Sequence, residues 1–204
     1  MTDPAPKYQP TDDRRRAIAA AARSLIVEKG FEGLRTRAIA DRVGINIATL
    51  HYHVPTKEAL IELVAQSMRD EFAVQHLREP RDGLSPEAQL KLEIRQFRQS
   101  RQENPELLQV MEELSRRARH DENIARYIQP MRAFWQRQIA NILEAGVADG
   151  TFRADLSPEP AAYLVIGTLI ALSSFGADDA AFEAAVTELF RAILSDEAKG
   201  NRHV

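Results

Sequence analysis

The chain has 204 residues, 44% of them hydrophobic and 28% charged, which is enough to bury one or two small hydrophobic cores. It contains no cysteine, which excludes a disulfide framework and thiolate chemistry. The net charge of −3 is unevenly spread: residues 1–57 hold ten Lys/Arg against six Asp/Glu, giving +4 and leaving −7 for the remainder. A basic N-terminal part joined to an acidic remainder is typical of a nucleic-acid-binding module attached to another domain.

Residues 1–10 carry three prolines and no apolar run, so we expect a mobile tail and no secretory signal. A helix is predicted next, over about residues 11–29. Its apolar residues recur at helical spacing and are Ile18, Ala22, Leu25 and Ile26. Gly30 is expected to end this helix, because glycine adopts the left-handed conformation at low cost. The arginines at 14–16 either contact phosphate or form a solvated basic face.

Two short helices joined by a tight turn are predicted next, over residues 36–43 and about residues 47–53. Gly44 is expected to stop the first helix. The spacing is that of a helix-turn-helix, whose second helix enters the major groove of DNA. The residues that carry this spacing are Ile39, small Ala40, Val43, Gly44, Ile45 and Leu50.

The exposed side of the second helix and its flanks carries side chains that hydrogen-bond to base edges and phosphates. The predicted DNA-binding residues are Thr36, Arg37, Asn46, Ile47, Ala48, Thr49, His51, Tyr52, His53 and Lys57. Within this set, the candidates for base readout are Asn46, Thr49 and His51. The candidates for holding phosphates are Thr36, Tyr52, His53 and Lys57, the last beside the free N–H groups that begin the next helix.

Other chemistry is not favoured by the sequence. His51 and His53 form a His-x-His pair, but residues i and i+2 of a helix point in different directions and no third ligand follows nearby. We therefore predict no metal site and no cofactor. The sequence has no Gly-rich phosphate loop, no GxSxG and no HExxH, so we predict no enzyme and no catalytic residue.

At this point the sequence resembles a known family. The segments Thr36-Arg37-x-Ile39-Ala40 and Val43-Gly44-Ile45-x-x-Ala48-Thr49-Leu50-His51-Tyr52-His53-Val54-x-x-Lys57-Glu58-x-Leu60 resemble the DNA-binding domain of the tetracycline-repressor (TetR) family. The resemblance covers roughly residues 14–64, with His51 where the family often has an aromatic residue and Val54 where it usually has Phe. It implies a homodimeric regulator with a three-helix DNA-binding head and a divergent helical body that binds a small molecule.

Further helices are predicted over about residues 56–76, 86–103, from 105, 122–146, from 158 to 175, with its apolar stretch at 161–175, and from 177 to 193. The first of these is expected to link head to body. Pro130 is expected to kink or break the helix that contains it. The helix over residues 161–175 is apolar almost all round, so it must be covered on several sides, yet it is too short to span a bilayer.

A ligand pocket in the body is predicted from inward aromatic, aliphatic and methionine side chains. These are Phe72, Phe97, Leu107, Met111, Tyr127, Phe134, Trp135, Ile139 and Tyr163. Each is more often a simple core residue than a ligand contact. Such a lining suits an unidentified apolar or amphipathic effector.

The last two predicted helices are interpreted as a four-helix dimer interface formed with their symmetry mates. The residues assigned to it are Leu164, Val165, Thr168, Leu169, Leu172, Phe182, Val186, Leu189, Phe190 and Ile193. The alternative is that both helices only complete the core of a monomer.

The sequence thus predicts an all-α protein with an N-terminal three-helix bundle and a larger C-terminal helical ligand-binding and dimerisation domain. The expected divisions are a tail at 1–10, a DNA-binding domain at 11–58, a body at 59–195 and a tail at 196–204. The predicted function is a cytoplasmic, ligand-responsive regulator, most often a repressor, that binds a pseudo-palindromic double-stranded DNA operator as a homodimer. No membrane association is expected. The alternative is a helical protein-interaction module that does not bind DNA.

Overall fold

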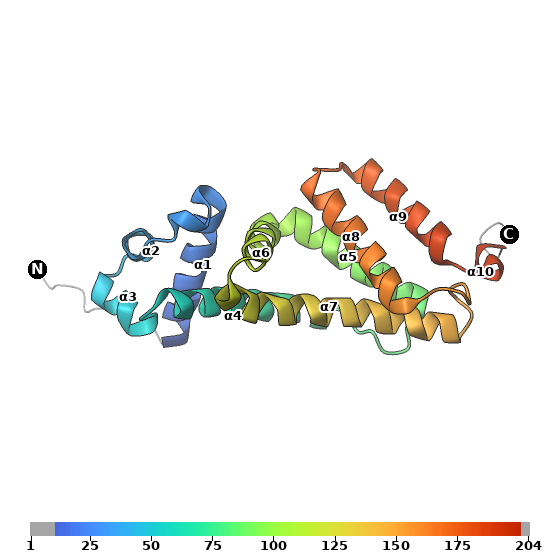
Figure 1. The fold of residues 1–204 in the computed structure, drawn as a ribbon, viewed down its shortest axis with the longest axis horizontal. Helices are drawn as coiled ribbons and strands as arrows, with labels where there is room; N and C mark the ends of the chain where they lie inside the picture. The colour runs from blue at the N-terminus through green and yellow to red at the C-terminus, as the bar shows by residue number, and fades with distance from the viewer. Residues whose placement is uncertain (1–10, 201–204) are drawn as a thin grey trace, which may run out of the picture. The chain divides into compact units, whose positions relative to one another are not determined.

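The computed structural model describes residues 11–200, and these are helical throughout apart from short connections (Figure 1). The elements are α1 (Thr11–Lys29), η1 (Phe31–Gly33), α2 (Thr36–Val43), α3 (Ile47–His53), α4 (Lys57–Leu77), α5 (Pro86–Glu103), α6 (Pro105–Arg117), α7 (Glu122–Ala148), α8 (Pro158–Ser174), α9 (Asp179–Ile193) and α10 (Asp196–Gly200). The only β pairing within this range is an isolated bridge between Phe152 and Leu194. The predicted all-α class is confirmed.

The predicted helix bounds hold closely in the N-terminal part, where α1, α2 and α3 begin and end as expected. Two expectations further along need correction. Pro130 does not break its helix, since α7 runs through it from Glu122 to Ala148. Fully buried Ile128 and Ile139 lie on either side, and their packing outweighs the hydrogen bond that the proline removes.

The second correction concerns the predicted C-terminal tail. Residues 196–200 are not irregular but form the short helix α10, in which Ala198 N–H donates to Ser195 Oγ at 3.2 Å. The remaining tail residues, 201–204, and the predicted N-terminal tail, 1–10, lie outside the described residues.

The described chain divides into two compact units. The first holds residues up to 75 together with 104–129, and the second holds 76–103 together with 130 onward. The predicted head, residues 11–58, lies wholly within the first unit. A functional boundary at residue 58 stays a prediction.

In the first unit, α1 packs against η1, α2 and α6. Its buried face is the predicted one, with Ile18, Ala22, Leu25 and Ile26 almost fully enclosed. On another side of α1, Arg23 pairs with Glu71 of α4 and lies 3.6 Å from a carboxylate oxygen of Glu106 in α6. This arginine therefore joins α1 to both later helices of the unit.

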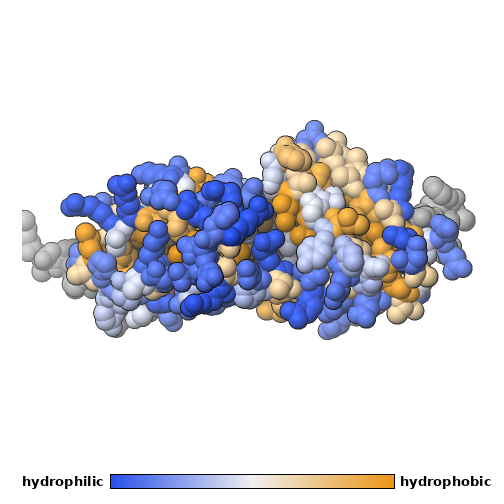
Figure 2. All heavy atoms as spheres, viewed as in Figure 1, coloured by the Kyte–Doolittle hydropathy of each residue, from blue (hydrophilic) through white to orange (hydrophobic). Residues whose placement is uncertain are grey.

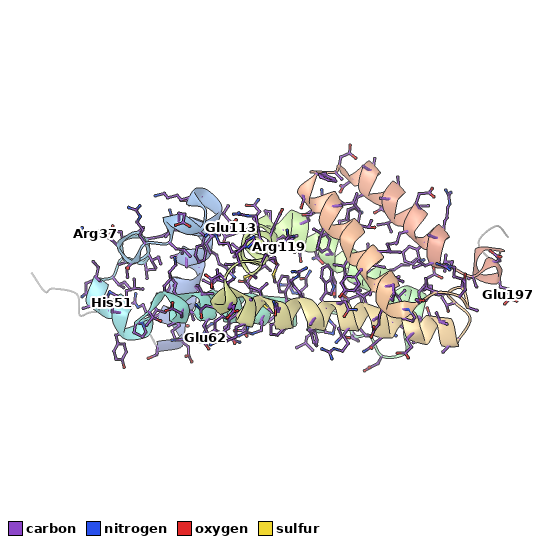
Figure 3. The ribbon with its side chains drawn as sticks, viewed as in Figure 1. Arg37, His51, Glu62, Glu113, Arg119 and Glu197 are labelled. Atoms are coloured by element: carbon purple, nitrogen blue, oxygen red, sulfur yellow. The ribbon has the colours of Figure 1, made fainter. Side chains whose placement is uncertain are left out.

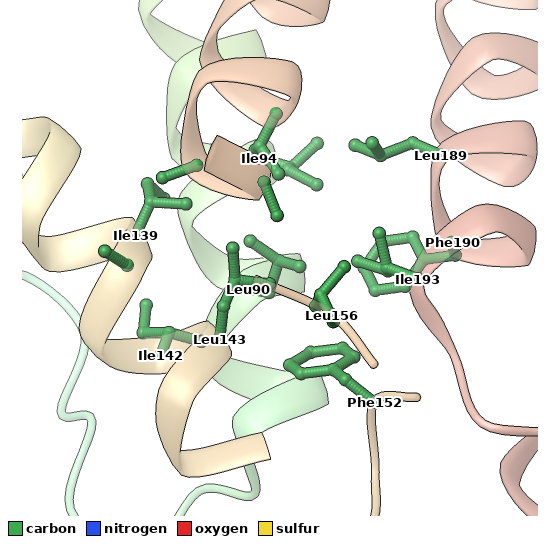
Figure 4. Packing of buried hydrophobic residues seen from close by; sticks show 14 of the residues in the cluster. Leu90, Ile94, Ile139, Ile142, Leu143, Phe152, Leu156, Leu189, Phe190 and Ile193 are labelled. Atoms are coloured by element: carbon green, nitrogen blue, oxygen red, sulfur yellow. The ribbon is translucent and has the colours of Figure 1, made fainter. Parts of the chain in front are cut away.

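The core of the second unit comes from α5, α7, α8, α9 and the loop that carries Phe152 (Figure 4). Leu90, Ile139 and Phe182 are buried there. Gly146 is required by this packing, because a Cβ at that position would lie 2.1 Å from the ring of Phe152. Figure 2 shows hydrophobic side chains on the visible surface of this unit and mainly hydrophilic ones over the first. None of the described helices combines the length and the hydropathy needed to cross a membrane.

Candidate nucleic-acid interface

The turn between α2 and α3 is closed by Gly44, whose backbone is left-handed at φ 71° and ψ 39°. Its N–H donates to Asp41 O at 3.3 Å, and the Ile45 N–H donates to Ala40 O at 3.0 Å. This pair of bonds satisfies carbonyl groups that the end of α2 would leave free. The predicted glycine corner is therefore confirmed, and it sets the angle at which α3 leaves α2.

The N-terminus of α3 is capped by Asn46, whose Oδ1 accepts a hydrogen bond from the Thr49 N–H at 2.7 Å. One turn later, Leu50 is fully buried, as is Ile39 of α2. While its oxygen serves as the cap, the amide N–H groups of Asn46 remain free to address a base.

The C-terminus of α3 is held from α1. The Arg15 guanidinium donates to the main-chain oxygen of His53 at 3.1 Å, across 38 residues of sequence. A cation at a helix C-terminus stabilises the free carbonyls there. Sequence reasoning treated Arg15 only as a phosphate contact or a solvated charge, since no local pattern links residues so far apart.

The opposite side of α3 is open. Tyr52 is 81% exposed and Ile47 is 42% exposed. His51 is exposed as well, and Figure 3 shows it together with Arg37 of α2, both pointing away from the core of the head. Thr36 and Ala48 are also exposed, whereas Thr49 and His53 are half-buried. A short helix fixed at both ends thus presents rings, a hydroxyl and methyl groups to solvent.

His53 differs from His51 in its surroundings. Its ring meets that of Tyr52 edge to face, with centroids 5.2 Å apart and planes at 82°. Burial, followed by the positive charges of Arg15 and Arg14, lowers the pKa of His53 below its ordinary value. The imidazole is therefore neutral at physiological pH, and the proximity of a phosphate would favour its protonation.

Lys57 begins α4, immediately after the cap at Thr56, whose Oγ1 accepts from the Ala59 N–H at 3.1 Å. Its Nζ lies 4.6 Å from the centroid of the buried Phe31 ring. The guanidinium of Arg117, the last residue of α6, lies 4.4 Å from the same centroid. Lys57 is exposed, so its ammonium is held by this contact and remains accessible to a phosphate.

The predicted pocket residues do not gather in one unit. Phe72, Leu107, Met111 and Tyr127 belong to the first unit, while Phe97, Phe134, Trp135, Ile139 and Tyr163 belong to the second. Phe97 and Trp135 stack with centroids 5.8 Å apart. The expectation that all nine face inward is wrong for Phe134 and Tyr163, which are 58% and 66% exposed, because α7 and α8 bury other faces in the core.

The predicted interface residues also need correction. Six of them are buried in the core of the single chain and cannot reach a partner, namely Val165, Leu169, Phe182, Leu189, Phe190 and Ile193. Leu172 and Val186 are half-buried and pack against this core. Leu164 is 63% exposed, and Thr168 is half-buried with its hydroxyl donating to Leu164 O at 2.7 Å. Because α8 is apolar on all sides, hydropathy alone could not distinguish its inner face from its outer one.

Across residues 11–200 there is no group of three or more His, Cys, Asp or Glu side chains arranged to hold a metal ion.

A small helical head, a glycine corner and an exposed second helix define a DNA-binding protein of the helix-turn-helix class. The family model described as "Bacterial regulatory proteins, tetR family" matches residues 18–64. Residues 18–64 therefore form a DNA-binding domain of the TetR family, and the matches together support a DNA-binding transcriptional regulator.

Curated relatives agree with this assignment. The chain is 24% identical over 156 residues to the HTH-type transcriptional repressor KstR2 of Rhodococcus jostii, covering 74% of this chain and 76% of that protein. It is 41% identical over 51 residues to the class D tetracycline repressor of Escherichia coli, covering 25% of this chain and 23% of the repressor. The stronger identity is therefore confined to a short stretch.

Solved structures share the fold over most of the chain. A TetR-family regulator from Agrobacterium tumefaciens has a TM-score of 0.78 at 20% identity, covering 91% of this chain and 100% of that one. A regulator from Saccharomonospora viridis in complex with choline has a TM-score of 0.77 at 20% identity, covering 90% and 99%. At these identities the likeness shows the fold alone.

Proposed function

We propose that this regulator is a repressor whose homodimer binds a pseudo-palindromic operator and is released by a small-molecule effector. The DNA-binding part of this proposal rests on how firmly α3 is held in place. Asn46 caps one end, Arg15 holds the other and Leu50 anchors the middle. A helix fixed on three points loses little further entropy when it enters the major groove.

The roles of the exposed side chains follow from their chemistry. Thr49, His51 and the amide of Asn46 are proposed to contact base edges, with Ile47 and Ala48 suited to thymine methyl groups. Thr36, Arg37, Tyr52, His53 and Lys57 are proposed to hold phosphates on either side of the groove.

For the dimer, α8 offers an outward apolar stripe in place of the buried residues predicted from the sequence. Its large exposed members are Tyr163, Leu164 and Ile170, and exposed Phe175 follows directly after the helix. Gly167 lies among them and is exposed, and a Cβ added to it would have no described atom within 4 Å apart from its chain neighbours and the backbone of its own helix. Glycine inside a helix costs about 1 kcal/mol, and a partner helix packed closely here would explain its presence. Two copies would place two recognition helices on successive half-sites.

The effector half of the proposal rests on family membership. A solved neighbour from Mycobacterium tuberculosis is titled a ketosteroid transcriptional regulator, and the neighbour from S. viridis was solved with choline. These ligands differ in chemistry, so neither transfers to this chain by likeness. An effector coupling of about 1–3 kcal/mol would change operator affinity about 5- to 150-fold.

The decisive experiment is the selection of duplexes from a random pool by the purified full chain. We expect enrichment of an inverted repeat whose half-sites lie about one helical turn apart. Thr49→Val should relax the sequence preference, while the matched substitution Thr187→Val on α9 should leave it unchanged. A pool that remains random at low salt would favour a protein-interaction module instead.

A further inference from the structure

A buried polar stripe runs along α5. Glu93, Gln96 and Ser100 are 8%, 6% and 7% exposed, and no other polar side chain of the described residues is buried to this extent. All three lie on α5 at positions i, i+3 and i+7, so they share one face of that helix. Buried polar groups are costly unless they are paired, and therefore such a stripe needs an explanation.

The stripe is joined by Arg81, from the segment between α4 and α5. Its Nη2 donates to Oε1 of Gln96 at 2.9 Å and to the carboxylate of Glu93. Its Nε and Nη2 also face the two ring nitrogens of His76, at 3.2 and 2.7 Å. Its Nη1 is buried and has no hydrogen-bond partner among residues 11–200.

The unmet group in this cluster is a donor, the Nη1 of Arg81. Burial and then the charge of Arg81 lower the pKa of His76, against the opposing effect of Glu93, so its imidazole is neutral at physiological pH. A neutral imidazole has a single acceptor nitrogen, and hence only one of its two contacts with Arg81 is a hydrogen bond at any time. The group that would complete the cluster is an oxygen that accepts from Nη1.

The charge of the missing group is also constrained. The charges of Arg81 and Glu93 cancel within the cluster. An anionic ligand would gain from Arg81 but meet the carboxylate of Glu93, and a cationic one would meet the guanidinium. Both would carry an uncompensated charge into a buried site. A neutral ligand avoids this cost.

Apolar side chains also flank the stripe on α5. Leu90 and Ile94 are buried on the same helix, and Phe97, which follows Gln96, stacks on Trp135. We propose that Arg81 and the polar stripe of α5 form the polar end of the effector site, which takes an uncharged, largely apolar molecule bearing a carbonyl or hydroxyl oxygen. This inference rests on the proposed ligand response and names the class of effector.

The position of Arg81 also gives the effector a route to the DNA-binding head. His76 belongs to the last turn of α4, and Lys57 is the first residue of that same helix. An oxygen ligand that draws the Arg81 guanidinium toward itself weakens its hold on His76. The C-terminal end of α4 is then less restrained.

The test compares three probes with the same chain length and different charge: 2-decanone, decanoate and decylamine. Trp135 is the single tryptophan of the chain, so intrinsic fluorescence reports directly on this region. At neutral pH we expect 2-decanone to bind the unmodified protein more tightly than either charged probe. Equal or tighter binding of decanoate or decylamine would overturn the inference without any variant.

A pair of variants then tests the named donor. Arg81→Lys keeps the charge beside Glu93 but removes the planar donor fork, and should weaken 2-decanone about fivefold. Arg95→Lys alters the exposed pair with Glu79 and should bind like the unmodified chain. A folded Arg81→Lys protein with unchanged ketone affinity contradicts the proposal. Operator binding is measured in parallel: protein that binds its operator but no probe refutes only this inference, whereas protein that binds no DNA refutes the proposed function.

Discussion

Arg15 of α1 and His53 at the end of α3 are joined by a hydrogen bond of 3.1 Å from guanidinium to main-chain oxygen. Through this contact, α1 helps to fix the orientation of α3, the proposed recognition helix. It also brings the positive charge of Arg15, in addition to that of Arg14, near the half-buried imidazole of His53. The orientation of α3 and the protonation of His53 are therefore linked.

Replacing Arg15 by Met should lower operator affinity about fivefold, because a charge-assisted bond worth about 1 kcal/mol at this partly exposed site is lost. Fluorescence anisotropy with a labelled operator would measure the change. Arg16→Met is the control, since Arg16 is exposed and pairs with nearby Asp13 at 3.0 Å. Equal losses in both variants would show that general charge, and not the contact with His53, is responsible.

Replacing Lys57 by Ala should weaken binding to every DNA sequence alike. Removing one phosphate contact should reduce the slope of log affinity against log salt by about 0.9. The measurement is a salt titration of anisotropy on operator and on unrelated duplex. Lys91→Ala, which removes a cation paired with Glu87 at 2.7 Å on α5, should leave the slope unchanged. An unaltered slope for Lys57→Ala would remove this residue from the phosphate contacts.

Stability should fall as the pH is lowered from about 7 to 5.5. Burial and neighbouring arginines lower the folded-state pKa of His53, whereas the unfolded imidazole keeps a pKa near 6.5. Below that value the unfolded chain binds more protons, so acid favours unfolding, and above it this contribution is constant. Urea unfolding at several pH values measures the slope. His53→Gln should flatten the dependence of stability on pH. His76→Gln should do the same, because burial and the charge of Arg81 lower the pKa of His76. The control, His51→Gln at an exposed site, should not flatten it.

Replacing Leu164 by Arg should give folded monomers, because this side chain is 63% exposed on the proposed dimer stripe. Replacing Leu169 by Arg should instead unfold the second unit, since Leu169 is fully buried and an unpaired buried charge is severely destabilising. Sedimentation velocity and circular dichroism distinguish the two outcomes. A Leu164→Arg protein that sediments as a dimer would place the interface elsewhere.

The helix-turn-helix was predictable because its signals are local. The turn needs one left-handed residue, which Gly44 supplies, and the following helix needs a cap, which Asn46 supplies within three residues. Ile39 and Leu50 then follow from helical spacing, and both are buried as the spacing requires. The bounds of α1, α2 and α3 could be derived for the same reason.

Three other features depend on contacts between residues far apart in the chain, and no periodic pattern encodes them. The first is the hydrogen bond from Arg15 to His53, and the second is the contact of Arg81 with the buried polar side chains of α5. The third is that Leu164 points outward from α8 whereas Leu169 points into the core. In α8 the apolar residues surround the helix, so its inner face is chosen by how well each side packs against α5 and α9. Hydrophobicity has no direction, whereas close packing and hydrogen bonding do, and they select one arrangement from those that the composition allows.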